Sequence, residues 1–367
     1  MNILYLTTHL DIGGITSYVL SLATGLKRRG HNVYVASSGG ELLPKFIEAG
    51  IIYIPIPINT KQEVSPKILI SLFRLLKHIE EKDIDIIHSN TRVTQVLGWL
   101  LNRFAGKPYI STCHGFFKTR ISRKLFPCWG KIVIAISEQV KEHLIQDFKL
   151  EDKDIVVIHN GVEVDKFGVW SSEFRVRKRK ELGLKDGPVV GIVARLSDVK
   201  GHLYLIEAIK LVLEEIPDAQ LLIVGEGKMK EELISLTQTL GIDKSVFFIP
   251  RIFDTQEVLS TLDLFVMPSL KEGLGLSLME AMAAGLAVIG SDVGGIRTLI
   301  QDGFNGLLVK PADVRQLSHA ISKLLKDSEK RGYLGNNARI FISQNFSKNK
   351  MVSKTEEVYL ECLKARD

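Results

Sequence analysis

Two glutamates, Glu272 and Glu280, flank a glycine-spaced loop in the stretch KEGLGLSLMEAMAAG. Within the loop, Gly273 and Gly275 would let backbone amides approach a ligand closely, because glycine carries no side chain. The helix expected to follow would add the positive end of its dipole, which favours a phosphate. A carboxylate can also accept hydrogen bonds from two sugar hydroxyls. The pattern therefore indicates a site for a nucleotide sugar, with one acid holding a ribose and the other a second sugar.

A structural interpretation of the same residues stays open. Ser277 and Glu280 match a capping box, in which serine and glutamate satisfy the first amides of a helix. Glu272 would then be a solvated loop acid. Glycosidases also use two carboxylates, but theirs must face one ligand across a short gap. A phosphate-suited loop between the two acids fits a nucleotide sugar better than a plain glycoside.

A pair of cations supports the phosphate interpretation. Arg195 and Lys200 lie in ARLSDVKG, directly after the strand-like run GPVVGIVA and before a helical segment. Arginine offers a planar fork and lysine a point charge, a combination suited to a diphosphate. As an alternative, both could be ordinary surface cations. Gly225 lies in the loop VGEG after the next strand. We expect it to form a tight turn or to line the binding site of a nucleotide base.

The elements that would position these residues follow from alternating patterns. Short apolar runs such as NILYLTT, NVYVAS, DIIHS, AQLLIVG and LFVMPS alternate with longer segments of helical period. This alternation predicts right-handed βαβ units and parallel sheets. A polar, glycine-punctuated stretch at 165–187 interrupts it. We therefore expect an N-terminal α/β domain at 1–170, a second at 171–349, and a final helix at 350–367.

Composition limits the class of protein. The chain has 367 residues, of which 45% are apolar and 25% charged, as expected for two globular domains. It contains no apolar run of the roughly 18 residues that would span a bilayer. Its N-terminus shows no signal-peptide pattern, and its three cysteines form no CxxC. We expect a cytoplasmic protein that can contact the inner face of a membrane.

The formal net charge of +6 is unevenly distributed. Between Ile86 and Ser137 there is no acidic residue, and basic residues are interleaved with aromatic ones. This mixture favours peripheral contact with an anionic membrane, although a core helix with a basic solvated face would look similar. No nucleic-acid recognition module is readable. The residues expected on the membrane patch are Lys118, Arg120, Arg123, Lys124 and Trp129.

Several motifs, taken in order, resemble the retaining glycosyltransferases of family 4. Besides the two glutamates in an E-x7-E spacing, the resemblance covers nearly the whole chain. It rests on Gly13-Gly14, STCHG at 111–115, IHNGVEVDKF at 158–167, ARLSDVKG at 194–201, VGEG at 224–227 and SDVGGI at 291–296. Any one motif is weak, but the ordered set is specific. One departure is Arg297-Thr298, where Pro-Glu is frequent in the family.

The resemblance implies the GT-B fold, in which two Rossmann-like doubly wound domains face each other across a cleft. The N-terminal domain, joined by the final helix, would bind the acceptor, and the C-terminal domain a nucleotide-diphosphate sugar. Glu280 would hold the ribose, Arg195 and Lys200 the diphosphate, and Glu272 the donor sugar. The other donor contacts would come from Gly14, Gly225, Gly273, Leu274, Gly275 and Leu276. His114 would lie near the transferred sugar and the acceptor.

The family resemblance also implies a chemistry. A sugar would move with retention of configuration to a glycan or lipid-linked acceptor, in cell-envelope or polysaccharide biosynthesis. We expect no metal and no other cofactor, because two cations already face the diphosphate. Asp83-Ile-Asp85 looks like a DxD metal motif but leads directly into the strand DIIHS. His88, at the end of that strand, is expected to be structural.

Three other functions remain possible on the residues. An NAD-dependent oxidoreductase fits poorly, because DIGGITSY is not G-x-G-x-x-G. A nucleotide-sugar 2-epimerase shares the fold class but not the E-x7-E spacing. A non-catalytic sugar-nucleotide sensor or membrane adaptor would not need the full set of Arg195, Lys200, Glu272 and Glu280.

Overall fold

The computed structural model describes residues 1–119, 123, 126–168 and 170–364. The chain separates into two compact units, one of Met1–Gly161 with the C-terminal segment from Lys348, the other of Val162–Ser347. The division falls earlier than residue 170, where the sequence pattern breaks. The reason is that Val162 pairs with Ser347, so the chain leaves the first sheet and joins the second unit at that point.

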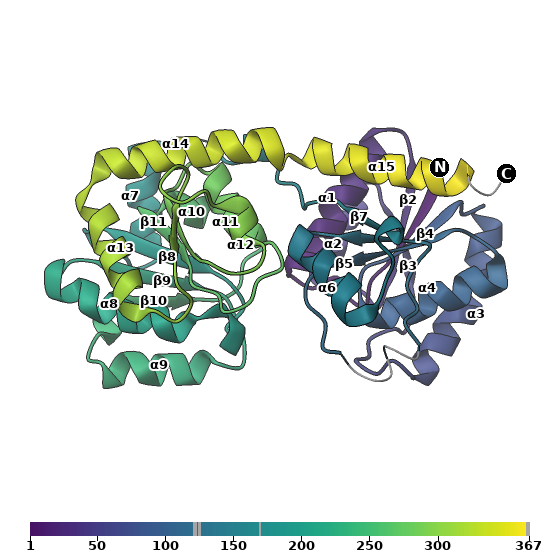
Figure 1. The fold of residues 1–367 in the computed structure, drawn as a ribbon, viewed down its shortest axis with the longest axis horizontal. Coiled ribbons are helices and arrows are strands. Elements are labelled where there is room, and N and C mark those ends of the chain that lie inside the picture. The colour runs from purple at the N-terminus through teal and green to yellow at the C-terminus, as the bar shows by residue number, and fades with distance from the viewer. Residues whose placement is uncertain (120–122, 124–125, 169, 365–367) are drawn as a thin grey trace. The chain divides into compact units, whose positions relative to one another are not determined.

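The first unit contains a seven-stranded parallel sheet with the order β3-β2-β1-β4-β5-β6-β7 (Figure 1). Most of its strand positions are buried, as expected where helices cover both faces of a parallel sheet. Its strands are β1 (Asn2–Leu6), β2 (Asn32–Ser37), β3 (Ile52–Pro55), β4 (Ile86–Ser89), β5 (Tyr109–Cys113), β6 (Ile132–Ala135) and β7 (Ile155–Val157).

The helices of this unit show why their sequences fold locally. In α3, Pro66 follows the N-cap Ser65, and the apolar residues at helical spacing, Ile68, Leu72 and Leu75, are buried against the sheet. A capping box at Thr91 starts α4, and Gly106 in the left-handed region ends it. The helices are α1 (Gly14–Arg28), α2 (Leu43–Glu48), α3 (Pro66–Glu81), α4 (Arg92–Ala105), α6 (Glu138–Phe148) and α15 (Lys348–Lys364), with the short 3-10 turn η1 (Asp152–Asp154).

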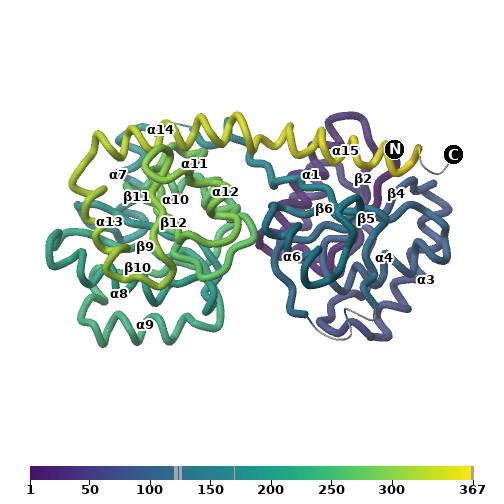
Figure 2. Tube along the Cα trace, in the orientation of Figure 1, coloured from purple at the N-terminus to yellow at the C-terminus, as the bar shows by residue number. Residues whose placement is uncertain are grey.

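The second unit contains a six-stranded parallel sheet with the order β10-β9-β8-β11-β12-β13. Figure 2 follows the chain through it from teal to yellow-green. Its strands are β8 (Val189–Val193), β9 (Gln220–Val224), β10 (Val246–Ile249), β11 (Leu264–Met267), β12 (Val288–Ser291) and β13 (Leu307–Val309). The sequence pattern did not predict the short strand β13.

Helices cover this second sheet as the alternating pattern predicts. A continuous apolar core joins β8, β9 and β11 to α8 and α13. The helices are α7 (Ser172–Glu181), α8 (His202–Glu215), α9 (Lys230–Thr239), α10 (Gln256–Ser260), α11 (Leu276–Ala283), α12 (Ile296–Leu299), α13 (Val314–Lys326) and α14 (Ser328–Asn345). The described residues of the unit also form the 3-10 turns η2 (Val164–Lys166), η3 (Asp198–Lys200) and η4 (Asp243–Ser245).

Each strand order reverses direction at one point, between β1 and β4 in the first sheet and between β8 and β11 in the second. At such a point the loops leaving the two strands turn to opposite sides, and a crevice opens at the carboxyl edge. The loop after β8 carries Arg195 and Lys200, the loop after β11 carries Glu272, and Glu280 follows in α11. Topology alone therefore brings residues 194–201 and 268–275 to one edge.

The last helix, α15, belongs to the first unit, as the resemblance implies for the segment 350–367. Its Tyr359 hydroxyl lies 2.8 Å from that of Tyr5 on β1. The same hydroxyl lies 2.6 Å from Nδ1 of His88, whose Nε2 lies 2.6 Å from Thr112 Oγ1. Burial lowers the pKa of His88 to about 3, so the ring is neutral within this network. His88 is structural, as predicted.

The structure also bears on the DxD-like pair and on membrane-spanning segments. Asp85 accepts a hydrogen bond from the backbone of Asn2 at 2.7 Å, so one carboxylate of the DxD-like pair holds the start of the first strand. Within the part of the chain that the structure describes, no helix is both long and apolar enough to cross a membrane.

Candidate active site

The loops after β8 and β11 meet at the edge where the second sheet reverses. Leu270 donates a backbone hydrogen bond to Val199 at 2.8 Å, which ties the two loops together. Their side chains join as well, because the ammonium group of Lys200 forms an ion pair with Oε2 of Glu272. Ser269 lies 3.5 Å from the same oxygen. Two residues expected to contact the donor are therefore in direct contact with each other.

Gly201 allows this close approach. Its φ of +72° lies in the left-handed region, and a Cβ there would lie 1.9 Å from the carbonyl oxygen of Pro268. Gly225 is similar, because a Cβ would lie 2.0 Å from the carbonyl oxygen of Ala194. Both glycines thus let a loop pack against the end of a neighbouring strand, in agreement with the tight turn predicted for VGEG.

The helix after the glycine loop, α11, begins at Leu276 with Gly275 as its N-cap at a φ of +97°. No side chain caps it. Ser277 instead donates to the carbonyl of Val193 at 2.7 Å and so fastens the helix start to the end of β8. The capping box that stood as the structural alternative for Glu280 is therefore not formed, and its carboxylate is left for another partner.

Glu280 is half-buried, and its Oε2 accepts a hydrogen bond from Thr255 Oγ1 at 3.0 Å. Burial raises the pKa of its carboxyl group to about 7, and the Thr255 hydrogen bond opposes that rise only in part. Asp254 nearby raises it further, while Lys166 lowers it. A carboxyl group kept in such surroundings costs stability when ionised, which is typical of a functional position.

Arg195, unlike the half-buried Glu280, lies at the protein surface. Its side chain is exposed, and among the described residues it takes part in no hydrogen bond or ion pair. The guanidinium group is thus available at the same edge as the Lys200–Glu272 pair. One cation is free and the other is held by a carboxylate.

A third loop, after β12, closes on the glutamate loop. The backbone of Gly295 donates to the carbonyl of Glu272 at 3.0 Å, and a Cβ on Gly295 would lie 2.2 Å from the carbonyl oxygen of Gly273. Arg297, the departure from the family pattern, forms a bidentate pair with Asp292, its Nη2 lying 3.0 Å from Oδ2. The extra cation is therefore neutralised within its own loop.

The first unit places His114 and the start of α1 at one edge of its sheet. His114 follows β5, and its Nε2 lies 3.2 Å from Asn90 Oδ1, just after β4. Its ring meets that of Tyr18 edge-on at 4.7 Å, one turn into α1. Burial lowers the pKa of His114 to about 3, so it is a neutral hydrogen-bonding group. A Cβ on Gly14 would meet no atom within 4 Å, so nothing in the described protein requires glycine there.

Of the five residues expected on a membrane patch, Arg120 and Lys124 lie outside the described residues. Lys118 is exposed, as predicted. Arg123 instead points inward, with Nε 3.1 Å from Glu63, and its side chain is 15% exposed. Trp129 is half-buried, stacked on Phe117 with centroids 6.1 Å apart. An acid from a distant segment and an aromatic cluster thus withdraw two of the expected residues from the surface.

Sequence reasoning missed three residues of these sites: Thr255, Asn90 and Glu63. The last two are separated from their partners by 24 and 60 positions, so no local pattern connects them. Thr255 follows a strand end, which is the one signal that could have selected it. Among residues that the structure describes, no group of three or more His, Cys, Asp or Glu side chains is arranged to hold a metal ion.

Two α/β units, each built on a parallel sheet, have the architecture of the GT-B glycosyltransferases. Solved structures share this fold over almost the whole chain. A glycosyltransferase from Rickettsia africae ESF-5 superposes with a TM-score of 0.88 at 24% identity, covering 99% of this chain and 98% of that one. Anabaena Alr3699/HepE, solved with UDP and glucose, gives 0.87 at 24% identity, covering 98% and 99%.

Sequence comparisons identify the family. Residues 12–166 match the model of Glycosyltransferase Family 4, and residues 174–341 that of Glycosyl transferases group 1. The Escherichia coli enzyme named UDP-Gal:alpha-D-GlcNAc-diphosphoundecaprenol alpha-1,3-galactosyltransferase is 33% identical over 311 residues, which are 80% of this chain and 79% of that enzyme. The chain belongs to glycosyltransferase family 4. The predicted family, fold class and enzyme class are confirmed.

Proposed function

We propose that this glycosyltransferase moves a sugar from a UDP-sugar to a glycan or lipid-linked acceptor, with retention of configuration. The observation that carries the proposal is the ion pair of Lys200 and Glu272, which joins the loops after β8 and β11 at the switch-point edge of the second unit. Arg195 lies in the first of these loops, and Glu280 lies in the helix that follows the second. The choice of UDP and of a lipid-linked acceptor rests on the name of the Escherichia coli relative. Synthesis of a cell-envelope polysaccharide is the setting that fits such an acceptor.

The charge that develops on the leaving diphosphate gives the two cations a catalytic role. When the bond between the anomeric carbon and the phosphate breaks, negative charge grows on the leaving diphosphate. Arg195 and Lys200 would stabilise that charge, and such electrostatic stabilisation is usually the largest catalytic contribution. Lys200 would exchange part of its contact with Glu272 for the phosphate, leaving the carboxylate to accept a hydroxyl of the donor sugar. Because the pair is preformed, both groups are already in position.

The remaining acid would bind the ribose. Glu280 has one oxygen on Thr255, and a carboxylate can accept several further hydrogen bonds. Two ribose hydroxyls would supply donors that favour the ionised form. Binding of UDP should therefore lower the pKa of Glu280 and release a proton near neutral pH.

In the retaining reaction that we propose, the acceptor hydroxyl attacks from the face that the diphosphate leaves, and a phosphate oxygen takes its proton. No protein side chain is then needed as a base, which suits the neutral His114. This residue would hold hydroxyls of the transferred sugar or the acceptor. We also propose that turnover needs no metal, because the two cations supply the positive charge; full activity in EDTA is the expected result.

Donor binding is the first test. A thermal-shift screen with UDP-, GDP- and ADP-sugars and with NAD should show stabilisation by UDP-sugars. Stabilisation by NAD alone would overturn the assignment. Product analysis then separates the alternatives: a free epimerised sugar nucleotide indicates an epimerase, and donor binding with no turnover of any acceptor indicates a sensor.

Lys200→Ala tests the catalytic step. We expect turnover to fall by about 100-fold, the typical effect of removing one stabilising group from a transition state. Lys326→Ala is a matched control, because it breaks a Lys–Glu pair with Glu215 in the same unit whose side chains are about half exposed. Equal activity of the two variants would remove Lys200 from the site.

Peripheral membrane contact is the last part of the proposal, and α3 supports it better than the residues first expected. Val64 and three residues on the outer face of the helix, Leu69, Ile70 and Phe73, are 92%, 53%, 48% and 71% exposed. Arg74 is exposed beside them. Apolar side chains flanked by cations suit the surface of an anionic bilayer.

Co-sedimentation with phosphatidylglycerol vesicles at low salt tests this contact. The wild-type protein should bind, and a Leu69→Ser/Phe73→Ser variant should bind more weakly. Ile340→Ser, which changes a side chain 54% exposed in the second unit, should have no effect. Absence of binding by the wild type would refute the membrane proposal without affecting the enzymatic one.

A further inference from the structure

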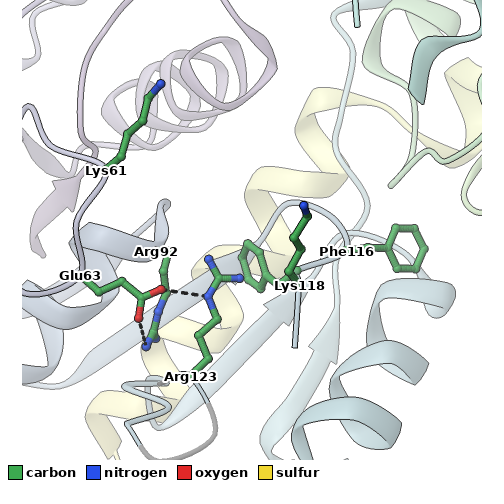
Figure 3. Close-up of a pocket in the computed structure, with 7 residues that line it drawn as sticks. Lys61, Glu63, Arg92, Phe116, Lys118 and Arg123 are labelled. Atoms are coloured by element: carbon green, nitrogen blue, oxygen red, sulfur yellow. Dashed lines mark hydrogen bonds and ion pairs between the residues drawn. The ribbon is translucent and has the colours of Figure 1, made fainter. Parts of the chain in front are cut away.

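A cavity of about 320 Å³ in the first unit is lined by four cations from three segments of the chain. Its volume lies at the lower end of the range of about 300–1,000 Å³ found for small-molecule sites. Lys61 comes from the connection between β3 and α3, Arg92 begins α4, and Lys118 and Arg123 follow β5. Glu63, Phe116 and Phe117 complete the lining. We name this set the basic cavity (Figure 3).

Glu63 shows what the basic cavity can hold. Figure 3 shows its carboxylate between two guanidinium groups, with Arg92 Nη2 at 3.2 Å and Arg123 Nε at 3.1 Å. Burial alone would raise the pKa of Glu63, but the hydrogen bonds from Arg92 and Arg123 lower it below its usual value. The acid is therefore ionised, and the two arginines already bind the oxygens of an anion in a bridging arrangement.

Both arginines are held by further contacts. Arg92 is 8% exposed and donates to the carbonyl oxygens of Pro127 at 2.5 Å and Phe126 at 2.6 Å. The guanidinium carbon of Arg123 lies 4.7 Å from the centroid of the Phe117 ring. Because these groups are ordered by the protein, an incoming anion would not have to immobilise them.

The lysines have no such partners. Lys61 and Lys118 are exposed, and neither forms a hydrogen bond or ion pair within the described residues. Four cations and one carboxylate give the cavity a formal charge of +3. An excess of positive charge in a concave site attracts anions that carry more than one negative charge. Phosphate and diphosphate groups meet this description better than a single carboxylate does.

The cavity also lies on the segment that carries the acceptor-side histidine. Phe116 comes two residues after His114, and both follow β5. We propose that the basic cavity binds a phosphate or diphosphate group of the acceptor, an inference that rests on the glycosyltransferase function proposed above. Arg92 and Arg123 shape the anion site, Lys61 and Lys118 supply the charge that attracts it, and Glu63 sets its strength by competing with the ligand.

Calorimetric titration with inorganic pyrophosphate, with the donor site filled by UDP, tests the proposal. Lys61→Ala/Lys118→Ala should weaken pyrophosphate binding by about tenfold or more, since the cavity would lose two of its four cations. Lys45→Ala/Lys77→Ala removes the same charge from α2 and α3, where both lysines pair with surface glutamates, and should change the affinity little. Equal affinities of the two double variants would overturn the proposal.

The substitution Glu63→Gln distinguishes a Glu63 that competes with the anion from a Glu63 whose role is only structural. The substitution keeps the shape of the side chain but removes the competing charge, so pyrophosphate should bind several-fold more tightly. Unchanged or weaker binding by a folded Glu63→Gln protein would refute the assignment of Glu63 as a competitor in an anion site.

Two further titrations distinguish the sources of the phosphate. Farnesyl diphosphate binding more tightly than pyrophosphate would indicate a lipid-linked diphosphate, and preference for glucose 1-phosphate would indicate a water-soluble acceptor. If neither compound competes with pyrophosphate, the cavity does not serve the acceptor. Failure of UDP to bind would refute the proposed function separately, because UDP is titrated alone in a first experiment.

Discussion

Replacing Glu280 with glutamine should stabilise the protein at high pH while weakening donor binding. In the folded chain, burial raises the pKa of this carboxyl group from 4.5 to about 7. Between these values the folded state holds a proton that the unfolded state has lost. Unfolding then releases protons, so the stability contributed by the neutral acid falls as the pH rises from about 4.5 through about 7.

The size of the effect follows from the difference between the two pKa values. A difference of about 2.5 at 1.36 kcal/mol per unit corresponds to about 3 kcal/mol, lost by pH 8. Glutamine does not titrate, and its carbonyl can still accept the hydrogen bond from Thr255. We expect Glu280→Gln to gain about 1–3 kcal/mol over the wild type at pH 8 and little or nothing at pH 5.

Urea unfolding of both proteins between pH 5 and 8 measures this difference. Calorimetric titration with UDP at pH 7, in buffers of different ionisation enthalpy, measures the proton that the wild type should release on binding. The variant should release none from this position and bind UDP at least tenfold more weakly, since it loses charge-assisted hydrogen bonds. Stability curves that stay parallel from pH 5 to pH 8 would refute the raised pKa, and unchanged UDP affinity would refute the ribose contact.

Two further substitutions test how the fold supports the sites. Gly201→Ala would place a Cβ 1.9 Å from the carbonyl oxygen of Pro268 at a φ of +72°, and should cost about 2 kcal/mol or more in urea unfolding. Gly30→Ala, at a φ of +88° with no atom within 4 Å, carries only the backbone strain, so an equal cost would contradict the steric account. Tyr359→Phe leaves the buried His88 without its 2.6 Å partner and should cost about 1–3 kcal/mol; a value near zero would show that this network is dispensable.

The prediction of donor-binding residues depended on local order along the chain. Arg195 and Lys200 were recognisable because each follows a buried strand, and the carboxyl ends of parallel strands lie at one edge. The pattern of Glu272 and Glu280 was visible for the same reason. It left the capping alternative open, since a serine three residues before a glutamate is equally compatible with either role. The hydrogen bond from Ser277 to the Val193 carbonyl excludes the capping box, and ribose binding by Glu280 stays a prediction.

For the expected membrane patch, local sequence was a poor guide to exposure. Arg123 and Trp129 lie in a basic, aromatic segment, and such a composition predicts an exposed surface. The structure leaves both only partly exposed, because Glu63 reaches Arg123 from 60 positions away and Trp129 packs against Phe117 and Phe148. Charge runs describe how a segment would behave alone, whereas burial depends on what packs against it.

Apart from the short strand β13, the order of strands and helices, the two α/β units and the enzyme family were readable from the chain, since they depend on periodicity and on motifs within a few residues. The partners of the charged groups were not: Lys200 with Glu272, Thr255 with Glu280, and Glu63 between two arginines. These pairs join positions 25 to 72 residues apart. These contacts, and the shifted pKa values of Glu280 and Glu63, arise only when the folded strands bring distant loops together and burial removes water from them.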